Sequence, residues 1–347
     1  LLQDGDHFLS CLERHGLQPR NCAVLGKPYS TSMTVVLNLM SRGYFVHPAS
    51  YQMEEREPLR RARDAASRSV LRTAAAWCTA DDQRRILILD SGGALIRLAH
   101  DDEFRSCRSR SSAVESTSQG IFELETLEPE LPVVNVARSW AKLVHESDSI
   151  GLAVVDELDR QISNIGAEVE QALVIGYGAI GRSVARCLDQ REIRVGVFDP
   201  AISPSDVEPG HEYRHQRLDA IRGAQLIVGC SGRPSLSDAD WGCLSERTIL
   251  ASASSYDIEF RGWQLRCAYQ PEALEVTSDS LGFDHLLHVR HLQHLRTRSS
   301  GEVFLGSRDD PSHYTYPVKF EDGRMVFILN GGCPVTFTGG PFALPPE

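Results

Sequence analysis

Residues 176–181 read Gly-Tyr-Gly-Ala-Ile-Gly and lie between a strand-like segment and a helix-like segment. The apolar run 171–175 before them is typical of a buried strand, and residues 182–190 after them have the spacing of an amphipathic helix. A second apolar run follows at 194–198. A strand, a glycine turn, a helix and a second strand in this order predict a βαβ unit with parallel strands.

Each glycine of this turn has a predicted role. Gly176 allows the tight turn, Gly178 lets the backbone approach a pyrophosphate, and Gly181 lets the helix pack closely on the strand. The N-terminus of the helix offers N–H groups and the positive end of its dipole to phosphates. The segment therefore predicts a dinucleotide site, although another adenine nucleotide, or a turn that binds nothing, would fit the same pattern.

Asp199 lies about 20 residues beyond the turn, where the ribose-binding acid of dinucleotide sites belongs. A carboxylate there accepts hydrogen bonds from the ribose hydroxyls and repels a 2′-phosphate, which favours NAD over NADP. A small-residue turn at 230–232 follows a later strand and either borders the same site or contacts no ligand. The predicted cofactor-binding residues are Gly176, Tyr177, Gly178, Ala179, Ile180, Gly181, Asp199, Cys230, Ser231 and Gly232.

The composition and charge of the chain exclude some classes of binding partner. The 347 residues suit two domains and carry a net charge of −11, which disfavours nucleic acid and anionic membrane surfaces. Arg105, Arg108 and Arg110 are interleaved with other residues, and we interpret them as a solvated loop. Nine cysteines without a CxxC pair predict reduced thiols. Since residues 1–20 have no signal-peptide pattern and no apolar run could span a bilayer, we expect a cytoplasmic protein with no membrane partner.

Short apolar runs alternate with helical segments in the first half of the chain as well, as at 85–90 and 131–136. This alternation predicts an α/β fold with two Rossmann-like domains and doubly wound parallel sheets. We expect a substrate-like α/β domain at 1–145, completed by a C-terminal return of residues 311–347, and an NAD-binding Rossmann domain at 150–310.

The glycine segment, with its tyrosine, resembles that of the S-adenosylhomocysteine hydrolase family, and shorter segments on either side resemble further motifs of that family. These segments are residues 33–34, 89–93 (LDSGG), 115–118 (ESTS), 134–142 (VNVARSWAK), 252–259 (SASSYDIE) and 320–330. The resemblance implies a small-molecule substrate, a homo-oligomer and NAD used as a built-in redox catalyst that oxidises a ribose hydroxyl. The chain ends soon after the last segment, so it resembles a divergent, C-terminally truncated relative.

The same resemblance implies three catalytic residues. Lys142 matches the catalytic lysine of the family, and Glu115 matches the glutamate that binds the ribose hydroxyls. Glu146 falls one helical turn after Lys142, and this i,i+4 spacing places both on one face of the helix predicted at 139–166. The plainer alternatives are an exposed lysine, a capping or surface acid at position 115, and a helix salt bridge.

Four positions depart from the family pattern. Ser32, Ser91, Ala137 and Ser255 stand where the family has His, Asp, Asn and His. Losing titratable groups removes the proton relay that elimination needs, so efficient hydrolysis of S-adenosylhomocysteine is not expected. We expect an NAD-dependent redox enzyme acting on a small hydroxylated or nucleoside-like metabolite. The alternative is a catalytically inactive homologue that binds NAD or an adenosine ligand and has a regulatory role.

No metal site is expected. His285, His288, His291 and His294 recur every third residue, but steps of three drift around a helix, so the four could not share one ion. Cys333 lies in an Asn-Gly-Gly-Cys-Pro turn and, without a matched histidine, is interpreted as a buried structural thiol.

Overall fold

The computed structural model describes residues 3–27, 30–50, 59–255, 257–262, 265 and 315–337. Within these residues the chain divides after Ser139 into two compact units. The first unit runs up to Ser139, and the second begins at Trp140 and includes residues 315–337. Each unit has its own cluster of buried apolar side chains, as expected for separate α/β domains.

The second unit is built on a seven-stranded sheet. Its strands are β6 (Gln171–Ile175), β7 (Arg194–Phe198), β8 (Glu212–Tyr213), β9 (Leu226–Gly229), β10 (Ile249–Ser252), β11 (Tyr316–Lys319) and β12 (Met325–Ile328). The spatial order is β11-β12-β10-β9-β6-β7-β8, and every neighbouring pair is parallel except the β11–β12 hairpin. The strand order therefore reverses between β6 and β9, and doubly wound sheets bind ligands at the carboxyl ends of the strands at such a point.

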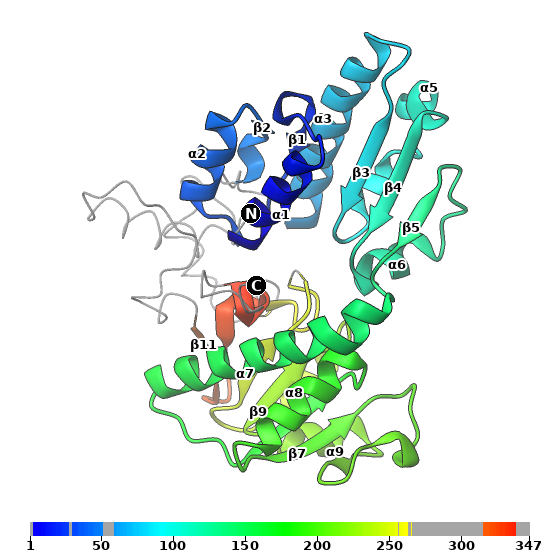
Figure 1. Cartoon of the computed structure of the whole chain (residues 1–347). Coiled ribbons are helices and arrows are strands. Elements are labelled where there is room, and N and C mark those ends of the chain that lie inside the picture. Colours follow the sequence, from blue (N-terminus) through cyan, green and yellow to red (C-terminus); the bar gives the residue numbers. More distant parts are fainter. Residues whose placement is uncertain are drawn as a thin grey trace, which may run out of the picture. The chain divides into compact units, whose positions relative to one another are not determined.

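Helices α7 (Ser147–Asn164) and α8 (Ala179–Asp189) pack against each other beside this sheet (Figure 1). A Cβ atom added to Gly151 would lie 2.1 Å from Ser183 Oγ, so the glycine permits the close approach of the two helices. A π-helical turn, η5 (Ala141–Glu146), leads directly into α7. The helix predicted at 139–166 is therefore a π-helical turn followed by an α-helix.

The remaining elements of the second unit are short. They are η6 (Pro204–Asp206), α9 (Arg217–Arg222), η7 (Asp238–Cys243), η9 (Leu329–Gly332) and η10 (Val335–Phe337).

The first unit holds two small parallel sheets. Its strands are β1 (Ala23–Val24) and β2 (Phe45–Val46) in one sheet, and β3 (Ile86–Asp90), β4 (Ser111–Glu115) and β5 (Val133–Asn135) in the other. Its helices are α1 (Gln3–Arg14), α2 (Met33–Ser41), α3 (Leu59–Thr79), α4 (Ala94–Leu98), α5 (Arg105–Arg108) and α6 (Ser118–Leu124), with the short turns η1 (Pro19–Asn21), η3 (Pro48–Ser50) and η4 (Asp102–Phe104).

The α/β class with parallel sheets is confirmed, but two details of the prediction need correction. Residues 311–347 were expected to return to the first domain, whereas their described part, 315–337, adds β11 and β12 to the sheet of the second unit. The apolar face of β12 is buried against β10, and this burial determines its place. The described strands of the first unit form two separate sheets instead of one doubly wound sheet.

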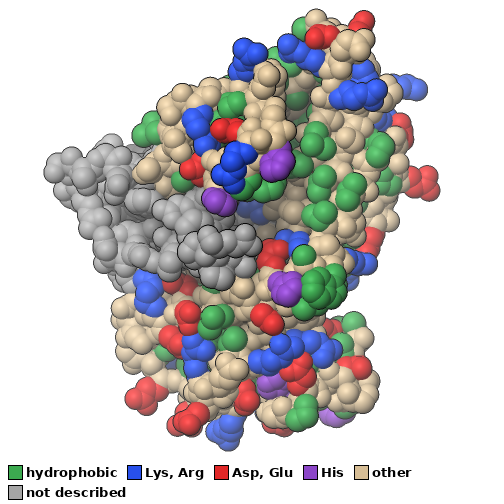
Figure 2. Space-filling view, viewed as in Figure 1, with side chains coloured by type: hydrophobic (Ala, Val, Ile, Leu, Met, Phe, Trp, Pro, Cys, Tyr) green, Lys and Arg blue, Asp and Glu red, His purple; other side chains and the backbone are tan. Residues whose placement is uncertain are grey.

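The basic segment at 105–110 also differs from the prediction. Arg108 is only 8% exposed and donates to the carbonyl oxygens of Ala99 and Asp101 at 3.3 and 3.1 Å, as well as to that of His100. Arg110 donates to the carbonyl oxygen of Cys78 at 3.0 Å. Arg108 and Arg110 therefore bind carbonyls at helix ends, whereas Arg105 is exposed, as expected for a solvated loop. Figure 2 shows acidic and basic side chains interspersed over the described part of the face it draws.

Within the described residues, no helix combines the length and the apolar character needed to cross a bilayer.

Candidate dinucleotide site

The loop between β6 and α8 contains the three glycines of the motif, and two of them are required by the protein itself. Gly176 has φ +91°, and a Cβ there would lie 2.6 Å from the Cα of Ser231 in the loop after β9. A Cβ on Gly181 would lie 1.9 Å from the carbonyl oxygen of Gly176. These two glycines therefore explain the tight turn and the close packing of α8, whether or not a ligand binds.

Gly178 is different, because no described atom lies close to the position that its side chain would occupy. Its φ is −72°, and a Cβ added to it would meet no atom within 4 Å. Gly178 is also the N-cap of α8, and no side chain caps this helix end. The N–H groups of the first turn, from Ala179 and Ile180 onward, and the positive end of the helix dipole thus lie beside open space. This arrangement matches the requirements of a bound pyrophosphate.

Asp199 follows β7 and faces the glycine loop. One carboxylate oxygen, Oδ2, accepts a hydrogen bond from the Tyr177 N–H at 2.7 Å, and Oδ1 accepts one from the Ala201 N–H at 2.9 Å. The side chain is half-buried. Each oxygen has a second lone pair, so the carboxylate can also accept from the hydroxyls of a ribose. The structure thus places Asp199 beside the motif, as the sequence predicts.

The side chain of Tyr177 packs inside the protein and does not lie on the open side of the glycine loop. It is buried, and its hydroxyl lies 2.6 Å from His211 Nδ1 and accepts from the Glu208 N–H at 3.3 Å. The Arg182 guanidinium lies 4.7 Å from the centre of its ring. Burial raises the pKa of Tyr177 and lowers the pKa of His211. Tyr177 therefore fixes the segment after β7 against the start of α8.

The turn Cys230-Ser231-Gly232 lies where the strand order reverses, because its backbone packs on Gly176. Burial raises the pKa of the Cys230 thiol far above its usual range, and the nearby Glu259 carboxylate adds to the effect. The raised pKa favours the neutral thiol over the thiolate. Ser231 and Gly232 are held by Glu259, which sequence reasoning missed, although it ends the SASSYDIE segment that carried part of the resemblance.

Lys142 and Glu146 are brought together by η5. Lys142 Nζ lies 2.8 Å from Glu146 Oε1, and both side chains are about one-third exposed. The structure thus shows the helix salt bridge that was the plainer alternative for Glu146. It leaves the predicted catalytic role of Lys142 untested.

Glu115 is fully buried at the end of β4 in the first unit. Its oxygens accept from the N–H groups of Gly92 and Gly93 at 3.1 and 2.9 Å, and from both the N–H and the hydroxyl of Thr117 at 2.7 Å. A Cβ on Gly120 would lie 2.1 Å from its carboxylate carbon. The carboxylate therefore connects the loops after β3 and β4, and its predicted contact with ribose hydroxyls stays a prediction.

Residues at the four divergent positions have ordinary structural roles where the structure describes them. Ser32 caps α2 by accepting from the Val35 N–H at 3.5 Å, and Ser91 Oγ accepts from Lys27 Nζ at 3.2 Å. Ala137 is buried, and Ser255 is half-buried after β10.

No group of three or more His, Cys, Asp or Glu side chains that could hold a metal occurs in the described part of the chain. The repeated histidines from His285 to His294 lie outside the described residues. Cys333 is buried, in agreement with its interpretation as a structural thiol.

The fold and the glycine loop define the class of this chain: a Rossmann-type α/β protein with a loop of the dinucleotide-binding kind. No family model matches the sequence. An uncharacterized protein of Mycobacterium tuberculosis, from strains CDC 1551 and H37Rv, is 31% identical over 269 residues, or 77% of this chain and 51% of that protein. The chain thus spans about half the length of these curated relatives.

More distant similarity reaches proteins of known name. Adenosylhomocysteinase of Thermoplasma volcanium is 25% identical over 183 residues, which cover 50% of this chain and 44% of that enzyme. Among solved structures, a Granulicella formate dehydrogenase has a TM-score of 0.36 at 14% identity, covering 52% of this chain and 54% of its own. D-lactate dehydrogenase from Escherichia coli, in its apo-structure, has a TM-score of 0.38 at 15% identity, covering 61% and 67%.

Proposed function

We propose that the second unit binds NAD(H) and that the protein carries out a redox step on a small hydroxylated or nucleoside-like metabolite. The observation that carries the cofactor assignment is the contrast among the three glycines. Gly176 and Gly181 are needed for internal packing, but Gly178 leaves space that no described atom fills. A glycine that the fold does not need, at an uncapped helix N-terminus, has a simple explanation if a phosphate approaches the backbone there.

The residues around this space have distinct roles in the proposal. The N–H groups of Gly178 to Ile180 hold the pyrophosphate, and Asp199 accepts from the adenosine ribose while disfavouring a 2′-phosphate. The 230–232 turn borders the other half of the cofactor. Bound NAD would supply a hydride acceptor.

The proposed proton-handling group is Lys142. Its ammonium is held 2.8 Å from the Glu146 carboxylate, so the pair can keep a proton in place on a partly exposed helix face. The similarity to adenosylhomocysteinase supports a nucleoside-like substrate.

A second candidate is a regulatory protein that binds NAD or an adenosine ligand without catalysis. The engagement of Glu115 favours it, because four donors from Gly92, Gly93 and Thr117 already occupy this carboxylate. A carboxylate so occupied is less available to orient a substrate.

The first test is a calorimetric titration of NAD⁺, NADH and NADP⁺ into the wild type and into the Gly178→Ala variant. A methyl group at position 178 fits the folded protein but occupies the space assigned to the pyrophosphate. We expect NAD⁺ affinity to fall about tenfold or more, with stability changed by no more than about 1 kcal/mol. The wild type should prefer NAD⁺ to NADP⁺, because of Asp199.

The matched control is Gly223→Ala. Gly223 ends α9, has φ −95°, and likewise has no atom within 4 Å of an added Cβ. The Gly223→Ala variant should bind NAD⁺ with the affinity of the wild type. Equal NAD⁺ binding by Gly178→Ala, or no dinucleotide binding by the wild type, would contradict the cofactor assignment. An NADH absorbance signal on adding nucleosides would distinguish the redox enzyme from the regulatory protein.

A further inference from the structure

Glu259 is an acidic side chain buried at the carboxyl edge of the sheet in the second unit. Its side chain is fully buried. A Cβ on Gly229, the last residue of β9, would lie 2.7 Å from the Cβ of Glu259, so the end of this strand is shaped to admit the glutamate. A buried carboxylate is costly unless hydrogen bonds compensate it, so its partners identify what it holds in place.

Four donors converge on this carboxylate. Ser231 Oγ donates to Oε2 at 2.8 Å and the Gly232 N–H donates to Oε1 at 2.7 Å. The hydroxyls of Ser235 and Ser254 donate to Oε2 and Oε1. Desolvation raises the pKa of Glu259, and these hydrogen bonds oppose the rise. The two oxygens of the Glu259 carboxylate can accept all four hydrogen bonds, so the network fixes the positions of its donors.

The donors come from two loops that follow β9 and β10. Ser231, Gly232 and Ser235 follow β9, and Ser254 follows β10. Both strands belong to the half of the sheet on the other side of β6 from β7 and β8. In doubly wound sheets each half binds one mononucleotide, and the glycine loop and Asp199 belong to the adenosine half. Glu259 therefore orders the loops of the remaining half.

We propose that Glu259 is a positioning residue for the nicotinamide ribose half of the cofactor, acting through Ser231, Gly232 and Ser254. This inference rests on the proposed binding of NAD(H). Glu259 itself touches neither cofactor nor substrate in this proposal. It holds the Gly232 backbone and the two serines in the geometry that the cofactor meets.

The test compares NAD⁺ with AMP, which contains only the adenosine half. Glu259→Gln keeps the shape of the side chain but replaces one of the two acceptor oxygens by an amide nitrogen, which donates and cannot accept from the serines. We expect its NAD⁺ affinity to fall about tenfold while AMP affinity stays within about twofold of the wild type. The control is Glu246→Gln, since Glu246 is exposed and accepts from the N–H of Met325, the first residue of β12. This variant should bind both ligands normally.

The outcomes separate the inference from the proposed function. Equal loss of NAD⁺ and AMP affinity would mean that Glu259 only supports the fold of the site, and unchanged affinities would mean that it positions nothing; either overturns the inference. If the wild type binds neither ligand, the proposed function fails and the inference with it. If Glu259→Gln does not fold, Ser254→Ala removes one donor and leaves the carboxylate in place. The same selective loss of NAD⁺ affinity is then expected, and its absence overturns the inference.

Discussion

A glycine in the loop after β6 can be required by the packing of the fold or by a bound ligand, and the surrounding atoms distinguish the two explanations. Gly176 has a positive φ and packs on Ser231, so any side chain would strain the fold. Gly178 has neither constraint. The sequence pattern predicts the position of all three glycines but gives them equal weight. Only the packing separates the glycine that a ligand explains from those that the fold explains.

His211 provides a prediction about pH. Its pKa is lowered by burial, so it stays neutral in the folded protein at pH values where an unfolded histidine, with a pKa of about 6.5, takes up a proton. The unfolded state then binds more protons, and the free energy of unfolding falls as the pH drops below about 6.5. Urea denaturation at pH 7.5 and 5.5 should show a smaller loss for His211→Gln than for the wild type.

The expected difference is below about 1 kcal/mol, because the imidazole is only half-buried and solvent screens its charge. His47 has a pKa lowered by burial too, so the variant should retain part of the pH dependence. Identical losses in the two proteins would show that His211 is protonated equally in the folded and unfolded states.

Residue pairs that meet only through the tertiary fold were beyond prediction. The position of Asp199 beside the motif follows from the strand that ends before it, whereas its contact with a ribose stays a prediction. Glu259 could not be identified in the same way, since its four donors lie 5 to 28 residues away along the chain. Glu115 was predicted to contact a ligand, and its carboxylate accepts from Gly92 and Gly93 in the loop after β3 and from Thr117, contacts that no local pattern encodes.

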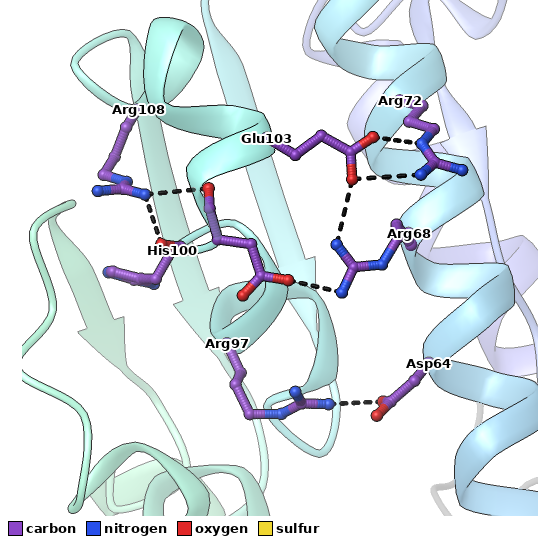
Figure 3. A network of polar contacts seen from close by, with 8 residues as sticks. Asp64, Arg68, Arg72, Arg97, His100, Glu103 and Arg108 are labelled. Atoms are coloured by element: carbon purple, nitrogen blue, oxygen red, sulfur yellow. Dashed lines mark hydrogen bonds and ion pairs between the residues drawn. The ribbon is translucent and has the colours of Figure 1, made fainter.

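At the scale of elements, the helices of the first unit are joined by a network of charged side chains (Figure 3). Arg68 and Arg72 on α3 pair with Glu103 on η4, and Arg97 on α4 pairs with Asp64 on α3 at 2.6 Å. These side chains are roughly one-third exposed or more, so each pair is worth little. Arg108 is the exception, because it is buried and donates to three backbone carbonyls as well as to the Glu130 carboxylate.

Replacing Arg108 should therefore cost far more than replacing Arg72. Arg108→Ala leaves the carbonyls of Ala99, His100 and Asp101 without their donor in a buried place, and we expect a loss of about 2–4 kcal/mol in the free energy of unfolding. Arg72, at 60% exposed, pairs with Glu103 alone, and Arg72→Ala should cost less than about 1 kcal/mol. Urea denaturation measures both, and similar losses would contradict the structural role assigned to Arg108.

Elements were predictable where a strand is buried along its length and less so where strands are short. The apolar runs at β6, β7, β9 and β10 are buried along their whole length or nearly so, which makes them visible as continuous apolar sequence. The place of β12 in the sheet could not be predicted, because its pairing with β10 joins Ile249 to Phe327, 78 residues apart, and no local pattern encodes such a contact.

At the scale of the whole molecule, the two compact units allow ligand effects to be separated. The glycine loop and the 230–232 turn belong to the second unit, whereas Glu115 and the loops that it connects belong to the first. A ligand slows hydrogen exchange chiefly in the parts that it binds or orders, since it stabilises the closed state there. Hydrogen exchange read by mass spectrometry can therefore assign each ligand to a unit.

We expect saturating NAD⁺ to protect residues 176–181 and 230–232 and to leave 90–93 and 115–117 unchanged. If the protein is an enzyme for a nucleoside-like substrate, adenosine added with NAD⁺ should protect residues 90–93 and 115–117 as well. The Glu115 carboxylate, the predicted partner of the ribose hydroxyls, connects these two loops. Gly178→Ala supplies the control, since it should lose the NAD⁺ effect while its first unit exchanges as in the wild type. Protection by NAD⁺ confined to the first unit would contradict the cofactor site. NAD⁺ protection in the second unit, with no adenosine effect in the first, would favour a role for NAD binding that involves no nucleoside substrate.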